Sequence, residues 1–262
     1  MISNTLTIAG TDCTGGAGIQ ADIKAISANG SYAMSVITAV VAQNTQGVQK
    51  IQMMPVEMIR AQIDSVFSDV QVDAVKIGML GNAEVIQCVA DALKTYQPSK
   101  VVLDPVMVAK SGDRLLDNDA VSALRELLLP KVGLITPNLP EAADLLGETQ
   151  ATTREQMLDQ SQRLGIATFL KGGHLLDQAD SPDLLWADGQ SHWLEAERIA
   201  TKNSHGTGCT LSAAIAAFWG QGDSLSLACA KAKAYLTGAL ANADVLNVGH
   251  GHGPVHHFYK YY

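Results

Sequence analysis

The stretch VDAVKIG at residues 72–78, together with VVLDP at residues 101–105, decides the fold class of this chain. The first stretch is strand-like and breaks at Gly78. The second opens with a continuous apolar run, as expected of a strand that is covered on both faces. Between them, Asn82 can cap a helix whose apolar side chains recur on one side. A strand, a helix and a second strand in this order predict neighbouring parallel strands.

The same alternation of strands and helices continues along the chain in both directions. Further strands are expected at residues 6–9, 32–41, 132–135 and 168–170, with a hairpin around Asp188-Gly189. Helices are expected between the strands, and two more close the chain at residues 210–219 and 225–240. This pattern predicts an α/β protein with a mainly parallel central sheet and helices on both faces. Because no linker, repeat or low-complexity segment interrupts it, residues 1–262 are expected to form a single domain.

Composition and charge exclude several classes of protein. The net charge of −8 argues against a nucleic-acid partner or binding to an anionic membrane. The four cysteines are scattered and form no CxxC pair, which fits reduced thiols and a cytoplasmic protein. The N-terminus does not have the pattern of a signal peptide, and no apolar stretch is long enough to span a bilayer.

The stretch SHGTGCTL at residues 204–211 is the first candidate for chemistry. Its two glycines lead into an apolar run that is predicted to be helical. The first amides of a helix have no intrahelical partner, and the helix dipole adds positive charge there. Gly206, Gly208 and their neighbours can therefore hold a phosphate, and Cys209 in the same field is expected to favour its thiolate. The alternative is that the glycines only turn the chain and that Cys209 is a small buried residue.

A second glycine-rich turn, Gly15 to Gly18, also precedes an expected helix. No GxxxxGK[ST] motif is present, so the chain is not a P-loop enzyme. Two such turns can face the two ends of a transferred phosphoryl group. A polar loop at residues 110–114 is a candidate lid, or else an ordinary surface connection.

Polar residues follow the predicted strands at the end where ligands bind in such sheets. Asn138 and Glu141 are three residues apart at a helix start, which predicts a reciprocal cap. Alternatively, their oxygens hold a hydrated Mg²⁺, directly or through water. Asp104 can add charge there, or else is a solvated acid. Lys171 can neutralise a transferring phosphoryl group, or else is an exposed lysine.

Two further residues have the chemistry to recognise an aminopyrimidine. The Gln43 amide offers a donor beside an acceptor, which matches an amino group next to a ring nitrogen. Asp22 can accept a hydrogen bond from the exocyclic amine. The alternatives are a solvated strand end for Gln43 and local capping for Asp22.

Taken in order, these motifs resemble the hydroxymethylpyrimidine kinase/phosphomethylpyrimidine kinase family of thiamine biosynthesis. The resemblance covers essentially the whole chain. It implies a ribokinase-like fold and ATP-dependent phosphorylation of 4-amino-5-hydroxymethyl-2-methylpyrimidine, then of its monophosphate. The motifs are residues 11–18, 41–45, 76–80, 104–106, 136–141, 171–174 and 205–210.

The resemblance also implies roles for individual residues. The pyrimidine is expected against Asp22, Gln43, Met79 and Val106, with Gly16 and Ala17 beside it. Independently of the resemblance, either the turn Gly15 to Gly18 or closure of a lid is expected to accommodate the charge of the monophosphate. Mg-ATP is expected near Asp104, Asn138, Glu141, Lys171 and Thr207, with Glu141 and Asn138 toward the metal. Catalysis is expected at Cys209, Gly206, Gly208 and Lys171.

The expected reaction is in-line transfer of the γ-phosphoryl group of ATP, with Cys209 taking the hydroxyl proton. A homodimer is implied by the resemblance alone. Two other functions remain open at this point. One is a pyridoxine or pyridoxal kinase, and the other is a non-catalytic sensor that binds the pyrimidine.

Overall fold

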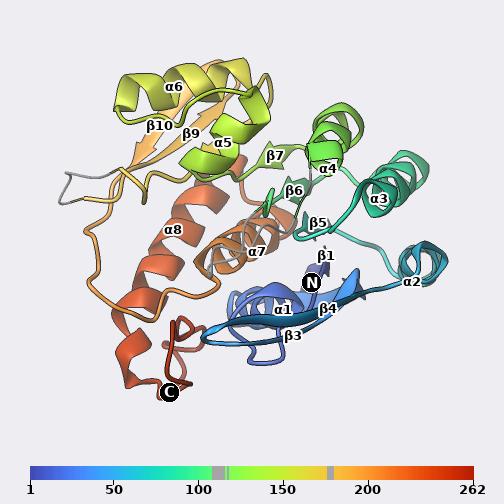
Figure 1. The fold of residues 1–262 in the computed structure, drawn as a ribbon, viewed down its shortest axis with the longest axis horizontal. Helices are drawn as coiled ribbons and strands as arrows, with labels where there is room; N and C mark the ends of the chain where they lie inside the picture. The colour runs from blue at the N-terminus through green and yellow to red at the C-terminus, as the bar shows by residue number, and fades with distance from the viewer. Residues whose placement is uncertain (108–115, 117, 176–179) are drawn as a thin grey trace.

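A single large sheet organises the molecule. The computed structural model describes residues 1–107, 116, 118–175 and 180–262. The strands of this sheet are β1 (Asn4–Ala9), β2 (Tyr32–Ile37), β5 (Ala74–Ile77), β6 (Val101–Leu103), β7 (Leu134–Ile135), β8 (Thr168–Leu170), β9 (Asp183–Ala187) and β10 (Gln190–Leu194). Their order is β10-β9-β8-β7-β6-β5-β1-β2. The six strands β8-β7-β6-β5-β1-β2 are parallel to one another. Strands β9 and β10 extend the sheet at the β8 edge with antiparallel pairing (Figure 1).

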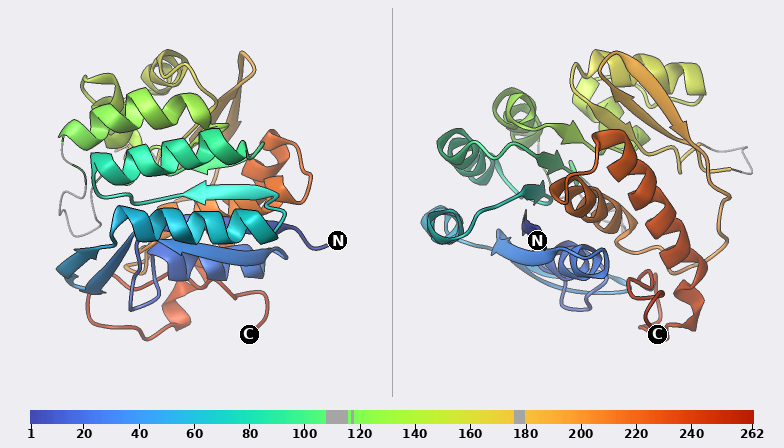
Figure 2. Two further views of the ribbon diagram at one scale, coloured as in Figure 1. Left: turned by 90° about the vertical axis from the view of Figure 1, so that its right-hand side faces the viewer. Right: turned by 180° about the vertical axis from the view of Figure 1, so that it is seen from behind.

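Helices cover both faces of the sheet (Figures 1 and 2). One face carries α2 (Val56–Asp69), α3 (Ala83–Tyr96) and α4 (Asn118–Ala123), which a π-helical turn continues over Leu124–Leu128. The other face carries α1 (Gly18–Ala28), α7 (Thr207–Gly220) and α8 (Leu225–Ala241). Near β8 and β9 lie α5 (Leu139–Leu146) and α6 (Arg154–Arg163).

The core follows from the alternation of side chains along the strands. Val75 and Ile77 of β5 belong to the cluster under α2 and α3, whereas Ala74 belongs to the cluster under α1 and α7. Helix α7 is lined with buried alanines, which let it lie close to the sheet and to both neighbouring helices. The middle of this central helix, Thr210 to Ala217, is buried, and its N-terminal residues are partly exposed.

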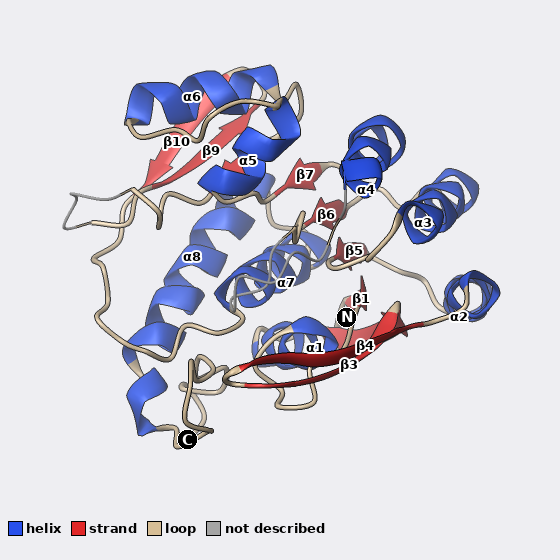
Figure 3. Cartoon of the chain, viewed as in Figure 1, coloured by secondary structure: helices blue, strands red, loops and turns tan. Residues whose placement is uncertain are grey.

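The predicted α/β fold is confirmed, with one difference in the second strand. Residues 32–41 were expected to form one strand, but β2 ends at Ile37 and β3 (Ala39–Asn44) pairs with β4 (Gly47–Met53) in a separate two-stranded sheet. The chain leaves the large sheet at Thr38, whose buried hydroxyl donates to the Met79 carbonyl. A continuous β-branched run does not reveal such a change of sheet. Figure 3 shows the small sheet beside α1.

Other expectations have different outcomes. The hairpin at Asp188-Gly189 is confirmed, with φ angles of 52° and 73° in its turn. The candidate lid at residues 110–114 lies outside the described residues. Among the described residues, no helix has the length and apolarity needed to cross a bilayer. A single domain over residues 1–262 stays a prediction.

Candidate active site

A cavity of about 780 Å³ opens at the carboxyl ends of the parallel strands. This is the edge at which ligands bind in open α/β sheets. Its lining includes Gln43 of the β3–β4 hairpin and Leu236 and Leu240 of α8. Its lining residues range from Ala9 to Leu240, so the cavity brings together residues that are far apart in the sequence.

Most of the predicted site residues line this cavity. They are Ala17, Gln43, Met79, Asp104, Val106, Asn138, Glu141, Lys171, Gly206, Thr207, Gly208 and Cys209. Two other predicted residues, Gly16 and Asp22, are not among the described residues of its lining. The expected meeting of distant motifs at one edge of the sheet is thus what the structure shows.

The turn before α7 presents open amides to the cavity. Gly206 is the N-cap residue with φ of 76°, and no side chain of the described residues caps the helix. The amides of Thr207, Gly208 and Cys209 come first in the helix, so they have no intrahelical acceptor. Together with the helix dipole they form a site suited to an anion.

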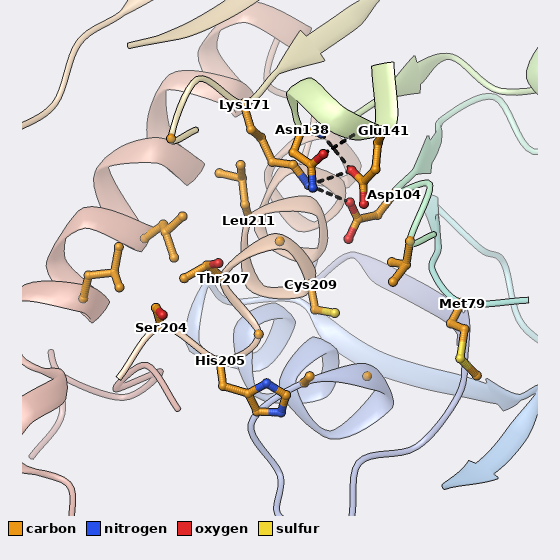
Figure 4. Close-up of a pocket in the computed structure, with 18 of the residues that line it drawn as sticks. Met79, Asp104, Asn138, Glu141, Lys171, Ser204, His205, Thr207, Cys209 and Leu211 are labelled. Carbon is orange, nitrogen blue, oxygen red and sulfur yellow. Dashed lines mark hydrogen bonds and ion pairs between the residues drawn. The ribbon is translucent and has the colours of Figure 1, made fainter. Parts of the chain in front are cut away.

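The ammonium group of Lys171 lies beside this turn (Figure 4). Its Nζ lies 3.0 Å from Asp104 Oδ1 and 3.8 Å from Glu141 Oε2. Burial alone would lower the pKa of Lys171, but the two carboxylates raise it above its usual value. The lysine is therefore charged at neutral pH, and its side chain is only 17% exposed. The exposed-lysine alternative is excluded.

Asn138 and Glu141 form the reciprocal cap of α5. Asn138 Oδ1 accepts from the Glu141 amide at 2.8 Å, and Glu141 Oε2 accepts from the Asn138 amide at 2.8 Å. Burial, helped by the charge of Asp104, raises the pKa of Glu141 to about 7 although Lys171 opposes the shift. The capping interpretation is confirmed, and the carboxyl group of Glu141 still lines the cavity.

The oxygen donors suit a metal that keeps most of its water. No three His, Cys, Asp or Glu side chains within the described ranges gather closely enough to hold a metal ion. Asp104 and Glu141 supply two carboxylates near Lys171. This set fits a hydrated Mg²⁺ that binds mainly to nucleotide phosphates, because Mg²⁺ typically uses one or two carboxylates in such sites.

Cys209 lines the cavity at the start of α7, on the side facing Met79 (Figure 4). Burial raises the pKa of its thiol to about 11, with Asp22 and Asp104 adding to the shift and Lys76 opposing it. The expectation that the helix start favours the thiolate is therefore wrong for the free site. Removal of the thiol from water and the nearby carboxylates outweigh the helix dipole.

Asp22 does not lie where direct contact with a pyrimidine amine was expected. Its side chain is completely buried, and its oxygens accept from Lys76 Nζ at 2.9 and 2.8 Å and from Thr7 Oγ1 at 2.6 Å. Neither direct binding of the amine nor local capping describes this residue. Lys76, which lines the cavity, was missed. Its signal was a lysine within the buried strand at residues 72–77.

The second glycine turn is closed, contrary to expectation. The amides of Gly16 and Ala17 donate to Asp12 Oδ2 at 3.1 and 2.8 Å. These donors are therefore not free to bind the phosphate of a substrate monophosphate, as had been expected of them. A carboxylate of the protein already occupies the position.

Apolar walls of the cavity were also missed. Val41, Val48 and Ile51 of the small sheet line the cavity, and so do Leu211 of α7 and Leu236 and Leu240 of α8. Nothing in the local sequence marks these residues, because the hairpin and the position of α8 are set by tertiary packing. Both walls can pack against flat aromatic rings.

Several known proteins are similar to this chain in sequence and in fold. The family model described as phosphomethylpyrimidine kinase matches residues 12–256. The hydroxymethylpyrimidine/phosphomethylpyrimidine kinase of Escherichia coli K12 is 54% identical, over 99% of this chain and 98% of that protein. The fold and the site thus define a kinase that acts on a small molecule. The chain belongs to the phosphomethylpyrimidine kinase family, as its motifs predicted.

Solved structures confirm the fold. Bacillus subtilis pyridoxal kinase in an ADP complex has a TM-score of 0.90 at 35% identity, covering 98% of each chain. A phosphomethylpyrimidine kinase from Clostridium difficile has a TM-score of 0.80 at 39% identity, covering 90% of this chain and 98% of that one. The ADP complex of the first structure agrees with nucleotide binding by this fold.

Proposed function

We propose that this chain transfers the γ-phosphoryl group of ATP to the hydroxymethyl oxygen of 4-amino-5-hydroxymethyl-2-methylpyrimidine and then phosphorylates the resulting monophosphate. The observation that carries this proposal is a single cavity lined by Gln43, Lys171 and the open amides before α7. The name of the 54% identical relative supports the same substrate. A flat ring fits the apolar end of the cavity, where Gln43 can pair with the ring nitrogen and its neighbouring amine.

Positioning and neutralisation of charge account for the chemistry. The amides of Gly206 to Cys209 and the Lys171 ammonium meet the oxygens of the transferring group, where negative charge must be stabilised. Lys171 is held in place by Asp104, which in turn accepts from Thr136 Oγ1 at 3.1 Å. Such fixed donors need little rearrangement when the reaction occurs.

Mg²⁺ would be held beside Glu141 and Asn138. The side-chain oxygen of Asn138 already accepts from the Glu141 amide, and it would reach the ion directly or through water. Glu141 supplies the carboxylate, directly or through water. When bound, the ion neutralises the terminal phosphates of ATP.

Cys209 receives the hydroxyl proton late in the reaction, as the thiolate, after its own proton has been lost to solvent. With a pKa of about 11, the thiol is protonated at neutral pH in the free site and is no early base. A loose phosphoryl-transfer transition state places little demand on early deprotonation. Cys209→Ala should lower kcat by about 10²- to 10⁴-fold, as general-base catalysis predicts, and leave pyrimidine affinity nearly unchanged. Cys13→Ser, which removes an exposed thiol, is the control. Near-normal turnover by Cys209→Ala would exclude Cys209 as the base.

A pyridoxal kinase activity is the second candidate. It is favoured by the TM-score of 0.90 with Bacillus subtilis pyridoxal kinase. Against it stands sequence identity, which is 35% for that enzyme and 54% for the Escherichia coli pyrimidine kinase. Parallel kinetics with both alcohols decide between them, since kcat/KM must be higher for the pyrimidine if our assignment is right.

We also propose a homodimer and a cytoplasmic location, where ATP is available. Val40 on β3 is apolar and 51% exposed, whereas the adjacent Val41 is buried and lines the cavity. An exposed apolar side chain on a small sheet is suited to an interface between copies. Analytical ultracentrifugation of the wild type and of Val40→Lys tests this, and a monomeric wild type contradicts it.

The decisive experiment measures ADP release with hydroxymethylpyrimidine as the acceptor. Mass spectrometry should detect the monophosphate first and the diphosphate later. Binding of the pyrimidine without any ADP formation in Mg-ATP would instead indicate a non-catalytic sensor.

A further inference from the structure

The Asp12 carboxylate is a buried centre that several donors share. Its side chain has no exposed surface. Oδ1 accepts from the amide and the hydroxyl of Thr14 at 2.9 and 2.7 Å, and Oδ2 accepts from the amides of Gly16 and Ala17. Asp12 therefore fixes the whole loop between β1 and α1.

The same carboxylate reaches across to the other glycine turn. His205 Nε2 lies 2.8 Å from Asp12 Oδ2. Burial alone would raise the pKa of Asp12, but the hydrogen bonds from His205 and Thr14 hold it well below its usual value. Because the ionised carboxylate can only accept, the proton of this bond belongs to His205 Nε2. His205 also directly precedes Gly206, the first residue of the anion-binding turn.

The backbones of the two turns are in direct contact at this point. A Cβ atom at Gly206 would overlap the carbonyl oxygen of Gly16. A Cβ atom at Gly16 would lie 2.6 Å from His205 Cδ2. The Gly18 amide also donates toward the Cys209 sulfur. The two turns are therefore packed directly against each other.

These two turns serve different halves of the cavity. Ala17 and Gly18 line it together with Gln43 and Met79, which the proposed function assigns to the acceptor. Gly206 to Gly208 line it on the side of the phosphates, near Lys171. The Asp12–His205 bond joins segments 193 residues apart in the chain and thereby joins the two halves.

We propose that Asp12 and His205 are positioning residues that set the distance between the acceptor oxygen and the phosphoryl group. The proposal rests on the proposed kinase function, since it concerns alignment of the two substrates. The Asp12–His205 pair holds the loop that carries the acceptor against the turn that carries the phosphate. It acts through the backbone of both turns and not by contact with the reacting atoms.

This role predicts a separation of binding from turnover. Each half of the cavity remains intact when the bond is lost, so the Kd of ADP and that of the pyrimidine should change by less than about threefold. Turnover should fall by about 10- to 100-fold, because small misplacement of aligned reactants is costly. Misaligned acceptor should also let water compete, so more than one ADP should form per phosphorylated pyrimidine.

The test compares His205→Ala, His205→Gln, Asp12→Asn and the double variant Asp12→Asn/His205→Ala. Glutamine places an N–H near the position of Nε2, so His205→Gln should recover part of the turnover lost in His205→Ala. The double variant should lose no more turnover than the worse single variant, because both remove one shared bond. If Asp12→Asn does not fold, the two His205 variants decide, since Asp12 keeps its loop donors in both.

Lys24→Met is the matched control. Lys24 Nζ donates to the Gly15 carbonyl at 2.8 Å, which ties the same loop to its own helix without reaching α7. It should leave kcat and the ratio of ADP to product unchanged. Additive losses of turnover in the double variant would overturn the positioning role. So would equal losses of affinity and turnover with one ADP formed per phosphorylated pyrimidine. A wild type that makes no phosphorylated pyrimidine overturns the proposed function instead, so the two failures are distinct.

Discussion

The two glycine-rich turns of this chain resemble each other in sequence and differ in what their amides face. Both precede a helix that packs on the same face of the sheet. At α1 the amides of Gly16 and Ala17 donate to the Asp12 carboxylate. At α7 the cap is Gly206, and no side chain within the described residues takes the first amides.

The difference teaches that glycine content alone does not make an anion site. A helix start binds an anion only when its donors lack an acceptor within the protein. Asp12 supplies that acceptor at the turn before α1 and closes it. At the turn before α7 no side chain of the described residues caps the helix, and Lys171 adds a cation beside it, so this turn stays open to phosphate.

Gly206→Ala should break the open turn and have the largest effect. Alanine at a φ of 76° costs about 1–2 kcal/mol, and its Cβ atom would overlap the Gly16 carbonyl. We expect kcat to fall by at least about 100-fold, because the turn must shift relative to the acceptor loop. The measurements are kcat by ADP release and the midpoint of thermal unfolding.

Gly165→Ala is the control for this substitution. Gly165 has a φ of 70° and no neighbouring atom within 4 Å of an added Cβ. Gly165→Ala should therefore lower the midpoint of thermal unfolding because of the unfavourable backbone conformation, and it should retain full turnover. Wild-type kcat in Gly206→Ala would contradict the importance of the close contact between the turns.

Lys171→Met should remove the cation of the open turn. We expect a loss of about 10²- to 10³-fold in kcat, as for removal of one charge-stabilising donor. Lys171→Arg should retain part of the activity because it keeps the charge. Lys24→Met removes the cation of the closed turn, where Lys24 Nζ donates to the Gly15 carbonyl at 2.8 Å, and should change kcat little. Similar losses from both methionine variants would mean that the turns do not differ in function.

Glu141→Gln should remove a pH dependence from the open site. The pKa of Glu141 is raised to about 7, so the carboxylate that a cation prefers forms only as pH rises through 7. Affinity for Mg-ADP, measured by calorimetry, should therefore increase from pH 6 to pH 8 in the wild type. Below the pKa of Glu141, the affinity should change by up to about tenfold per pH unit, which is the limit when binding releases one proton. In Glu141→Gln the affinity should be flat over this range, and an unchanged slope would exclude Glu141.

Thr14→Ala should have the smallest effect on turnover and act on stability alone. It deletes a hydroxyl that donates to Asp12 at 2.7 Å, in the closed turn. Loss of one hydrogen bond to a charged group costs about 1.5–3 kcal/mol, less where water replaces it, as at the half-buried Thr14. Urea unfolding should report this loss, with kcat within about twofold. A large loss of turnover would show that the Thr14 hydroxyl is also needed to align the acceptor loop, in addition to the Asp12–His205 pair.

Much of the fold could be predicted from periodicity. The strands at residues 101–103 and 168–170 and the hairpin at Asp188-Gly189 were predicted where they occur. The break at Thr38 and the strand at residues 47–53 were not. That strand is largely exposed, so no buried face imposes a regular alternation on its sequence.

Site residues were predictable where chemistry and strand ends coincide. Lys171 and Glu141 follow directly from that rule, and both line the cavity. Asp22 and Lys76 did not follow from it, because their partnership joins α1 to β5 across 54 residues. A buried lysine in a strand is a signal only when its partner is known.

The sequence by itself determined the alternation of strands and helices, the two glycine turns and the set of polar groups at the strand ends, since these depend on local periodicity and backbone freedom. Only the tertiary structure decided which turn is open, because the Asp12 side chain lies against the amides of Gly16 and Ala17, whereas no side chain of the described residues caps α7. It also decided the protonation of Cys209 and Glu141, since burial and neighbouring charges outweigh any local property of those residues.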